Sequence, residues 1–125
     1  MTPKFRVWDR LTGKMFPVGI IDYSIQSVYI EEPNEMYCER DFDDVELMQY
    51  TGLKDKNGKE IFEGDIVKYK LGGDTFTDIV AYNNWRACFY LKDDTGDALC
   101  SFDYLLEDVR LDNIEVVGNE FEKLG

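Results

Sequence analysis

The chain has 125 residues, enough for one modest hydrophobic core or for a small barrel with an appendage. Hydrophobic residues make up 44% of it and charged residues 32%, a composition that favours an ordered globular protein. Its net charge of −12 disfavours direct binding to nucleic acid, because phosphate groups are neutralised by clustered Lys and Arg side chains.

The sequence offers no sign of a membrane span or of a metal site. No apolar run approaches the roughly 20 residues that cross a bilayer, and the first residues lack the apolar stretch of a secretory signal. Three unclustered cysteines (Cys38, Cys88 and Cys100) and no histidine indicate reduced packing residues, not disulfides or a zinc centre. We therefore expect a cytoplasmic protein with no cofactor and no membrane partner.

The first 30 residues predict three strands. Residues 5–8 and 25–30 combine β-branched and aromatic residues with alternating polarity, and residues 15–23 form a second apolar stretch between them. Pro17 lies inside that second stretch, so its strand must be an edge strand or carry a bulge there.

Residues 31–46 interrupt this pattern and carry eight acidic residues against Arg40 alone, a balance of −7. The sequence predicts a loop or a short helix here, acting as an acidic linker. Carboxylates could bind Ca²⁺ or Mg²⁺, but their spacing does not match an EF-hand loop, so a solvated linker is the preferred interpretation.

The middle of the chain predicts a hairpin. A strand resumes at 45–51, and Asn57-Gly58 then stands between two apolar segments, a pair that favours a tight turn because both residues accept positive φ. Gly64-Asp65 predicts a turn into a strand over 66–71, and Gly-Asp-Ile-Val resembles the opening strand of many SH3-like barrels.

Short strands separated by turns follow to the end of the chain. We predict strands over 75–82, 87–91, 98–102 and 113–118, with a single helical turn over 104–109. The fold class is therefore mainly β, with antiparallel N-terminal strands followed by an SH3-like small barrel and little helix. We place the N-terminal β segment and its acidic linker in residues 1–46 and the barrel in residues 47–125, with one intertwined domain as the alternative.

Three blocks of the sequence resemble one known family. They are Lys4–Asp9, the long block Leu47–Val67, and Ile114–Asn119, and together they resemble YopX-like proteins, which are found largely in phages and prophages. The resemblance implies a β-rich fold with an SH3-like barrel and a bacterial host cell, and it implies no catalytic residue set. Residues 33–43 depart from the family pattern, as does a short tail after Asn119, so these regions are candidates for binding that is specific to this protein.

An enzyme is not expected. Without histidine, the usual activation of a serine or cysteine nucleophile is absent, and Gly72-Gly73 lacks the downstream Lys-Ser/Thr of a phosphate-binding loop. Paired carboxylates could act as acid and base, but acidic residues in a chain this negative are ordinarily solvated surface.

Aromatic residues predict a binding groove. Tyr69, Tyr82, Trp85 and Phe89 could line a surface for an extended peptide, although core packing explains most of them equally well. Trp85 stands in a polar corner beside Arg86, and Trp and Arg are enriched at binding hot spots. We therefore select Trp85, Arg86 and Tyr82 as candidate partner-binding residues.

The leading hypothesis is a phage accessory protein that acts by binding a host or phage protein or by self-assembly into a homo-oligomer. The alternative is an acidic inhibitor that mimics DNA charge and occupies a host nucleic-acid enzyme. Such a mimic needs an ordered stripe of carboxylates with phosphate-like spacing, which a flexible acidic loop would not provide.

Overall fold

The computed structural model describes residues 4–32, 36–84, 87–93, 95, 98–101 and 113–122, which form antiparallel strands in two compact units. Unit 1 is Met1–Tyr50 and unit 2 is Thr51–Gly125. The chain is mainly β, as predicted, and the one helical segment among the described residues is the short 3₁₀ turn η1. No described helix is long and apolar enough to span a bilayer.

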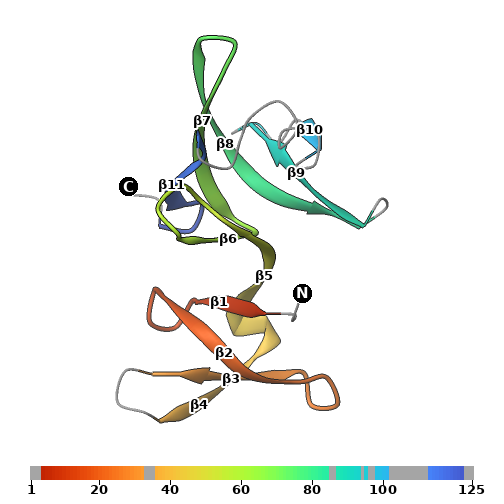
Figure 1. Ribbon diagram of the computed structural model, residues 1–125. Coiled ribbons are helices and arrows are strands. Elements are labelled where there is room, and N and C mark those ends of the chain that lie inside the picture. Colours follow the sequence, from red (N-terminus) through yellow and green to blue (C-terminus); the bar gives the residue numbers. More distant parts are fainter. Residues whose placement is uncertain are drawn as a thin grey trace. The chain divides into compact units, whose positions relative to one another are not determined.

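The described elements are labelled in Figure 1 in chain order. They are β1 (Phe5–Asp9), β2 (Lys14–Asp22), β3 (Ser27–Glu31), β4 (Tyr37–Asp41), η1 (Phe42–Asp44), β5 (Val45–Lys54), β6 (Glu60–Phe62), β7 (Asp65–Leu71), β8 (Asp74–Asn83), β9 (Cys88–Lys92), β10 (Ala98–Ser101) and β11 (Glu115–Asn119).

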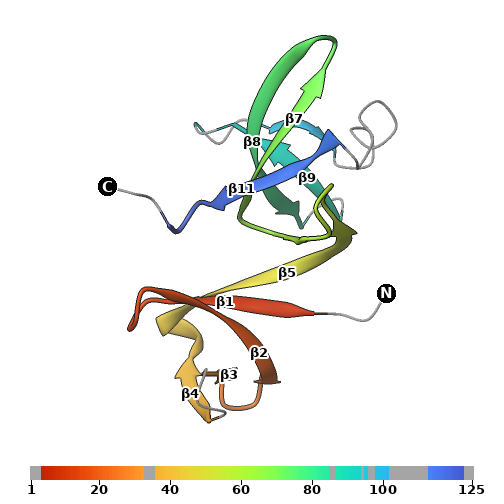
Figure 2. The same ribbon diagram turned by 60° about the vertical axis from the view of Figure 1, so that its left-hand side comes forward.

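Unit 1 is a sheet with strand order β4-β3-β2-β1-β5, and both Figure 1 and Figure 2 show β1 between β2 and β5. The first strand thus pairs with one that lies some 40 residues further along the chain, with Val7 opposite Leu47. Alternation within the strands turns one set of apolar residues inward, and the buried core consists of Val7, Phe16, Val28, Ile30 and Val45.

Pro17 occupies an interior strand, which a proline tolerates only where the hydrogen-bond ladder is interrupted. In β2 the pairing with β1 ends at Pro17, and the pairing with β3 begins at Val18. The register also shifts between Val18 and Ile20, which marks a bulge at Gly19. The predicted bulge is therefore present next to Pro17, although β2 is not an edge strand.

The acidic segment is more ordered than the sequence predicted. Instead of a continuous loop over 31–46, the described residues form β4, η1 and the start of β5. The alternation in β4 was hidden because its inward-facing positions are Cys38 and Arg40, not aliphatic residues. Arg40 is tolerated there because it pairs with the fully buried Asp9 of β1.

Unit 2 contains a five-stranded sheet in the order β10-β9-β8-β7-β11, and the C-terminal part of β5 pairs with β6. Its buried core is formed by Ile61, Val67, Tyr69, Val80, Leu91, Ile114 and Val116. Within the described residues the five-stranded sheet ends at β10 and at β11 without closing on itself, so the structure shows antiparallel sheets, and the SH3-like barrel stays a prediction. The helical turn predicted over 104–109 lies outside the described residues.

The hairpin between β5 and β6 forms as predicted. Gly58 has a φ of 80°, whereas Asn57 does not have positive φ, so the turn uses only one residue in the left-handed region. The backbone N–H of Gly58 donates to the carbonyl of Asp55 at 3.0 Å, and the N–H of Asp55 donates to the carbonyl of Lys59 at 2.8 Å.

The buried Asp55 carboxylate fastens this turn to the last strand. One of its oxygens accepts hydrogen bonds from the N–H groups of Asn57 and Lys59, and the other accepts one from Val116 in β11 at 2.9 Å. In the next turn Asp65 accepts a hydrogen bond from the N–H of Phe62 at 2.8 Å. These polar residues of the block 47–67 therefore have a structural task, satisfying buried backbone donors.

Candidate functional site

The predicted aromatic groove is only partly described. Trp85 and Arg86 lie outside the described residues. Tyr82 lies in β8, half-buried, with its ring edge-on to that of Phe89 at a centroid distance of 5.1 Å. Tyr69 is 4% exposed and its hydroxyl donates to Asp78 at 2.6 Å, so this member of the set belongs to the core and offers no open aromatic surface.

A different surface gathers exposed aromatic and apolar side chains, on the sheet of unit 1. Residues directly opposite one another in antiparallel strands share a face. Ile20 of β2 stands opposite Tyr29 of β3, and Tyr29 stands opposite Glu39 of β4. In the neighbouring row Glu31 stands opposite Tyr37. We call these five residues, Ile20, Tyr29, Glu31, Tyr37 and Glu39, the outer face of unit 1.

The inner rows confirm this division, because they carry the buried residues. Val18, Ile30 and Cys38 form one row, and Ile21, Val28 and Arg40 form another. Val28 and Ile30 have no exposed surface, whereas Ile20 is 56% exposed and Tyr37 is 59% exposed.

The ring of Tyr37 lies over the bulge in β2, where glycine leaves room for it. A Cβ atom at Gly19 would lie 2.7 Å from the Cε1 atom of Tyr37, closer than van der Waals contact permits. The Tyr37 hydroxyl donates to the Glu31 carboxylate at 3.2 Å, which fixes the far end of the ring. An aromatic ring covering a glycine across a sheet is a recurrent way of stabilising strands, and here it also places an aromatic surface toward solvent.

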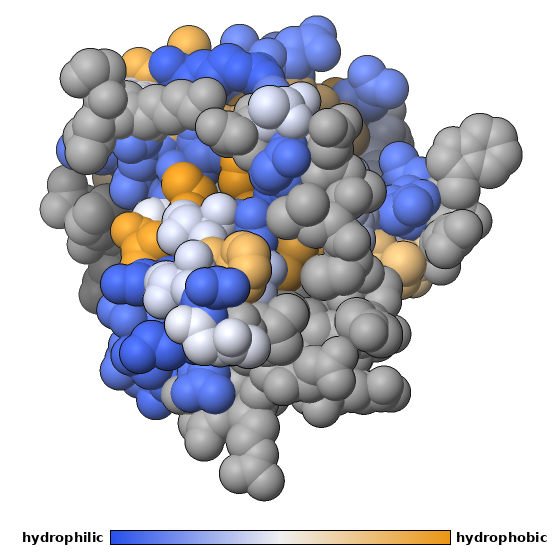
Figure 3. Space-filling model, turned by 90° about the horizontal axis from the view of Figure 1, so that it is seen from above, coloured by the Kyte–Doolittle hydropathy of each residue, from blue (hydrophilic) through white to orange (hydrophobic). Residues whose placement is uncertain are grey.

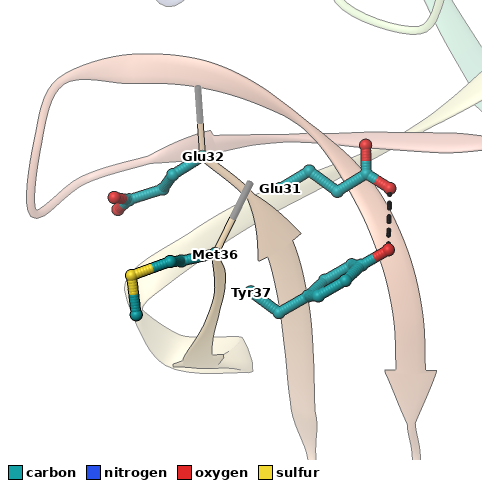
Figure 4. A pocket seen from close by; sticks show the side chains of 4 residues that line it. All are labelled: Glu31, Glu32, Met36 and Tyr37. Carbon is teal, nitrogen blue, oxygen red and sulfur yellow. Dashed lines mark hydrogen bonds between the residues drawn. The ribbon is translucent and has the colours of Figure 1, made fainter. Parts of the chain in front are cut away.

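A pocket of about 280 Å³ opens at the end of this face, where β3 finishes and β4 begins. It is lined by Glu31, Glu32, Met36 and Tyr37. Figure 4 shows the Glu31 carboxylate and the Tyr37 hydroxyl pointing toward one another, with Glu32 and Met36 on the other side of the pocket. Its lining combines an aromatic ring, a thioether and two carboxylates, which suits a ligand with both an apolar and a cationic part.

β4, which carries Tyr37 and Glu39, is anchored by an ion pair on its inner side. The Arg40 guanidinium lies 3.1 Å from the Asp9 carboxylate and 3.8 Å from that of Glu32. Burial by itself would raise the pKa of Asp9, but hydrogen bonds from Thr12 and Arg40 outweigh it and hold the pKa of that carboxyl below its ordinary value. Asp9 therefore stays ionised at neutral pH, and its ion pair with Arg40 links β1 to β4.

β4 is the edge strand of its sheet and is flanked by negative charge. Its exposed positions are Tyr37, Glu39 and Asp41, and its single arginine is turned inward. Edge strands can pair with an added strand, and many proteins discourage such pairing by covering the edge or by placing charged residues or proline along it. β4 carries no proline but has three charged residues, Glu39, Arg40 and Asp41, so its edge disfavours any segment that does not neutralise the two outward carboxylates.

Exposed hydrophobic side chains are concentrated in unit 1. In the part of the chain that the structure describes, eight large hydrophobic residues are exposed, and all but Phe76 and Val117 belong to unit 1. On the face shown in Figure 3, hydrophobic atoms form small patches beside hydrophilic ones. Of the six in unit 1, Ile20 and Tyr37 lie on the outer face, whereas Leu11, Tyr23 and Ile25 lie in turns. Scattered apolar residues are ordinary on any protein, so Ile20 and Tyr37, which share a sheet face, are the ones of interest as an interaction surface.

Two comparisons identify relatives of this chain. The family model described as YopX protein matches residues 4–123. The chain belongs to the YopX protein family. Protein EF1440 from Enterococcus faecalis, known from a crystal structure, is similar to this YopX-family chain, with 30% identity over 95% of this chain and 93% of that one and a TM-score of 0.60. No curated protein matches.

The outer face lies outside the blocks that carry the YopX resemblance, 4–9, 47–67 and 114–119. Sequence reasoning missed Tyr37 and Ile20 because it interpreted 31–46 as a linker and considered β2 only for its proline. The signal that could have found them is Tyr37-Cys38-Glu39-Arg40-Asp41, in which every second residue is suited to solvent.

Proposed function

We propose that this YopX-family protein is a non-enzymatic binding protein, and that the outer face of unit 1 and the edge of β4 receive an extended, basic segment of a partner protein. The observation that carries the proposal is the exposed aromatic and apolar group around Tyr37 on an edge strand. An extended segment would add to the edge by main-chain hydrogen bonds, while the side chains beside it determine which segment is accepted.

Charge favours a basic occupant. Residues 31–46 carry a balance of −7, and their one cation, Arg40, already serves Asp9. Glu31, Glu39 and Asp41 are exposed and close to the strand edge. Lys and Arg side chains on an incoming strand would meet these carboxylates, and such complementarity raises the association rate and rejects acidic segments.

Three further points concern the origin of the protein, the compartment in which it acts and the role of unit 2. We propose a phage or prophage origin and action in the cytoplasm of a bacterial host, on the basis of the family resemblance. We also propose that unit 2 is an SH3-like barrel, which the order β10-β9-β8-β7-β11 supports, and that it acts as a scaffold. Self-assembly through β4 is the competing mode of action.

The DNA-mimic alternative receives weaker support. It requires a long ordered stripe of carboxylates, and β4 carries just two outward-facing ones, Glu39 and Asp41, with Tyr37 ahead of them. Because an aromatic residue stands beside these carboxylates, the surface is better suited to binding a peptide than to imitating a phosphate backbone.

The test is a selection of random peptides displayed on phage, followed by fluorescence anisotropy with the peptides enriched. We expect enriched peptides to alternate apolar with Lys or Arg residues. Tyr37→Ala should weaken their binding by roughly tenfold or more, the effect expected for an aromatic hot spot. Gly19→Ala should also weaken binding, because the added methyl group would lie 2.7 Å from the Cε1 atom of Tyr37 and displace the ring from its place on the outer face.

Matched controls separate the site from general effects. Leu11→Ala removes an exposed apolar side chain (64% exposed) outside the outer face and should leave binding unchanged. Glu39→Lys should weaken binding of basic peptides, whereas Asp74→Lys, the same charge change in unit 2, should not. Equal losses in site and control variants would reject the proposal. A dimer in light scattering that Tyr37→Ala converts to a monomer would instead establish self-assembly.

A further inference from the structure

Unit 2 contains a concave site whose charge is opposite to that of the whole chain. A cavity of about 290 Å³ is lined by Lys56, Lys68, Tyr69, Lys70, Thr75, Asn113 and Glu115. Three of its seven lining residues are lysines and one is a carboxylate, whereas the chain as a whole carries −12.

Strand register explains why the lysines gather. Lys68 and Lys70 are two residues apart in β7 and therefore project from the same face of the strand. Lys70 stands opposite Thr75 of β8, which adds a hydroxyl group beside the second ammonium group. Lys56 enters from the β5–β6 turn, held there by the hydrogen bond from its backbone N–H to the carbonyl of Ile114 at 2.9 Å.

The single carboxylate of the cavity pairs with only one of the three lysines. Glu115 stands opposite Lys68 in the sheet, yet its ion pair is with Lys56, at 3.1 Å. Within the described residues, Lys68 and Lys70 form no ion pair, and both side chains are exposed. Two ammonium groups on adjacent same-face positions repel one another, and an anion placed between them would remove that repulsion.

The lining groups are suited to one class of anion. Ammonium, hydroxyl and amide groups all donate hydrogen bonds, and phosphate oxygens accept several at once. Lysine is a frequent ligand of phosphate in proteins, where it acts as a point charge. The negative charge of other regions is screened over about 10 Å at 0.1 M salt, so it does not prevent binding at a local positive site.

We infer that Lys68, Lys70 and Lys56, with Thr75 and Asn113, form a binding site for a phosphate group in unit 2. The group is either free phosphate or part of a small phosphorylated molecule such as a nucleotide. This site is separate from the outer face of unit 1, and it stands or falls independently of the peptide-binding proposal.

The site can be tested by titrating the ¹⁵N-labelled full-length protein with sodium phosphate, sodium pyrophosphate and adenosine monophosphate. Ionic strength is held constant by exchange against NaCl, because salt alone changes the stability of a highly charged protein. We expect saturable changes in the amide signals of Lys56, Lys68, Lys70 and Thr75. The double variant Lys68→Gln/Lys70→Gln should weaken binding at least about tenfold, since it removes two charged donors.

The matched control is Lys14→Gln/Lys54→Gln, which removes the same charge at two exposed lysines outside the cavity and should bind phosphate normally. Equal binding of all three ligands would mean that the phosphate group alone is recognised, and at least tenfold tighter binding of the nucleotide would mean that its base or sugar is also held. Both results support the site.

Two results would overturn the inference. One is a change in signals spread over the lysines of the whole chain, and the other is an equal loss in the double variant and its control. If Lys68→Gln/Lys70→Gln is not folded by circular dichroism, the single variant Lys70→Gln decides in the same way. Neither variant should alter peptide binding by unit 1.

Discussion

The two units bury a carboxylate in different ways. In unit 1, Asp9 is satisfied mainly by side chains, those of Arg40 and Thr12, with one backbone N–H from Leu11. In unit 2, Asp55 is satisfied entirely by backbone N–H groups, from Asn57, Lys59 and Val116. Backbone donors are present whatever the local sequence, whereas Arg40 must be supplied by the acidic segment.

The two carboxylates also differ in how far their partners lie along the chain. The Asp55 turn falls inside the block 47–67, and the one donor outside that block is Val116. Asp9 lies in β1, but its cation, Arg40, comes from β4. β4 therefore stabilises the core of unit 1 on its inner side, while Tyr37, Glu39 and Asp41 are exposed on its outer side.

Replacement of Asp55 by alanine should have the largest effect of the changes considered. Three N–H groups would lose a charged acceptor, and each such hydrogen bond contributes about 1.5–3 kcal/mol, partly recovered by water. We expect a loss of roughly 3–5 kcal/mol in urea unfolding. Asp74→Ala, at an exposed strand end, is the control and should cost less than about 0.5 kcal/mol. A similar cost for both would refute the anchoring role of Asp55.

Asp9→Ala should destabilise the protein somewhat less, by about 2–4 kcal/mol, because it leaves Arg40 without its main partner. The Arg40 side chain is 16% exposed and would still lie near the Glu32 carboxylate, and both facts lower the cost in stability. Replacing the ion pair by an apolar pair, in the double variant Asp9→Leu/Arg40→Met, should recover part of the lost stability. A double variant no more stable than Asp9→Ala would contradict the assignment of the loss to an unpaired Arg40.

Acid should remove the contribution that the Asp9 and Asp55 carboxylates make to the free energy of unfolding. Burial raises the pKa of Asp55, but the N–H groups of Val116, Lys59 and Asn57 outweigh it and lower the pKa below the ordinary 3.8. Asp9 is shifted in the same direction. A carboxyl with a lowered pKa in the folded state stabilises it above the unfolded-state pKa, and that stabilisation is lost as the pH falls through the folded-state value. The stability gap between the native protein and Asp55→Ala should therefore narrow from about pH 5 downward, and a gap that stays constant to pH 2.5 would contradict this.

Gly58→Val should cost roughly 1–3 kcal/mol, because φ is 80° and a β-branched residue is strained there. No atom lies within 4 Å of the position that the new Cβ atom would take, so backbone strain is the only cause. Gly58→Asn isolates that cause, since asparagine tolerates this region, and should cost distinctly less. The urea midpoint measures both, and an unchanged midpoint for valine would reject the turn geometry.

The smallest expected effect is that of salt. Like charges in residues 31–46 repel one another in the folded state, and 0.5 M NaCl screens them better than 20 mM. We expect a melting temperature higher by roughly 2–6 °C, corresponding to about 1 kcal/mol. The double variant Glu39→Gln/Asp41→Asn should show a smaller rise in melting temperature between 20 mM and 0.5 M NaCl, because it carries fewer like charges. A falling melting temperature would mean that the acidic residues are locally paired.

Much of the fold could be predicted from the sequence, because alternating apolar residues and turn pairs are local signals. The strands around Val7, Val67 and Val80 follow from such patterns. β4 was harder to predict, since one of its two inward positions is an arginine whose partner, Asp9, lies 31 residues away. Local patterns carry no information about such a partner.

The candidate sites were less predictable still. Lys68 and Lys70 could be assigned to one face from their spacing, but the approach of Lys56 depends on a turn that folds back toward Ile114. The ring of Tyr37 has room over β2 because the residue beneath it, at a bulge, is Gly19. Register shifts of this kind leave no mark in alternation and become visible only in three dimensions.

The strand β5 has a consequence for how this chain tolerates length changes. It pairs with β1 through residues such as Leu47, and with β6 beyond Tyr50, so the chain passes from unit 1 to unit 2 within a single strand. One inserted residue between Tyr50 and Thr51 would turn every later side chain of β5 to the opposite face unless a bulge absorbed it. Recombination that exchanges units between relatives would therefore have to preserve the frame of this strand, because no linker is present at the junction to accommodate an error.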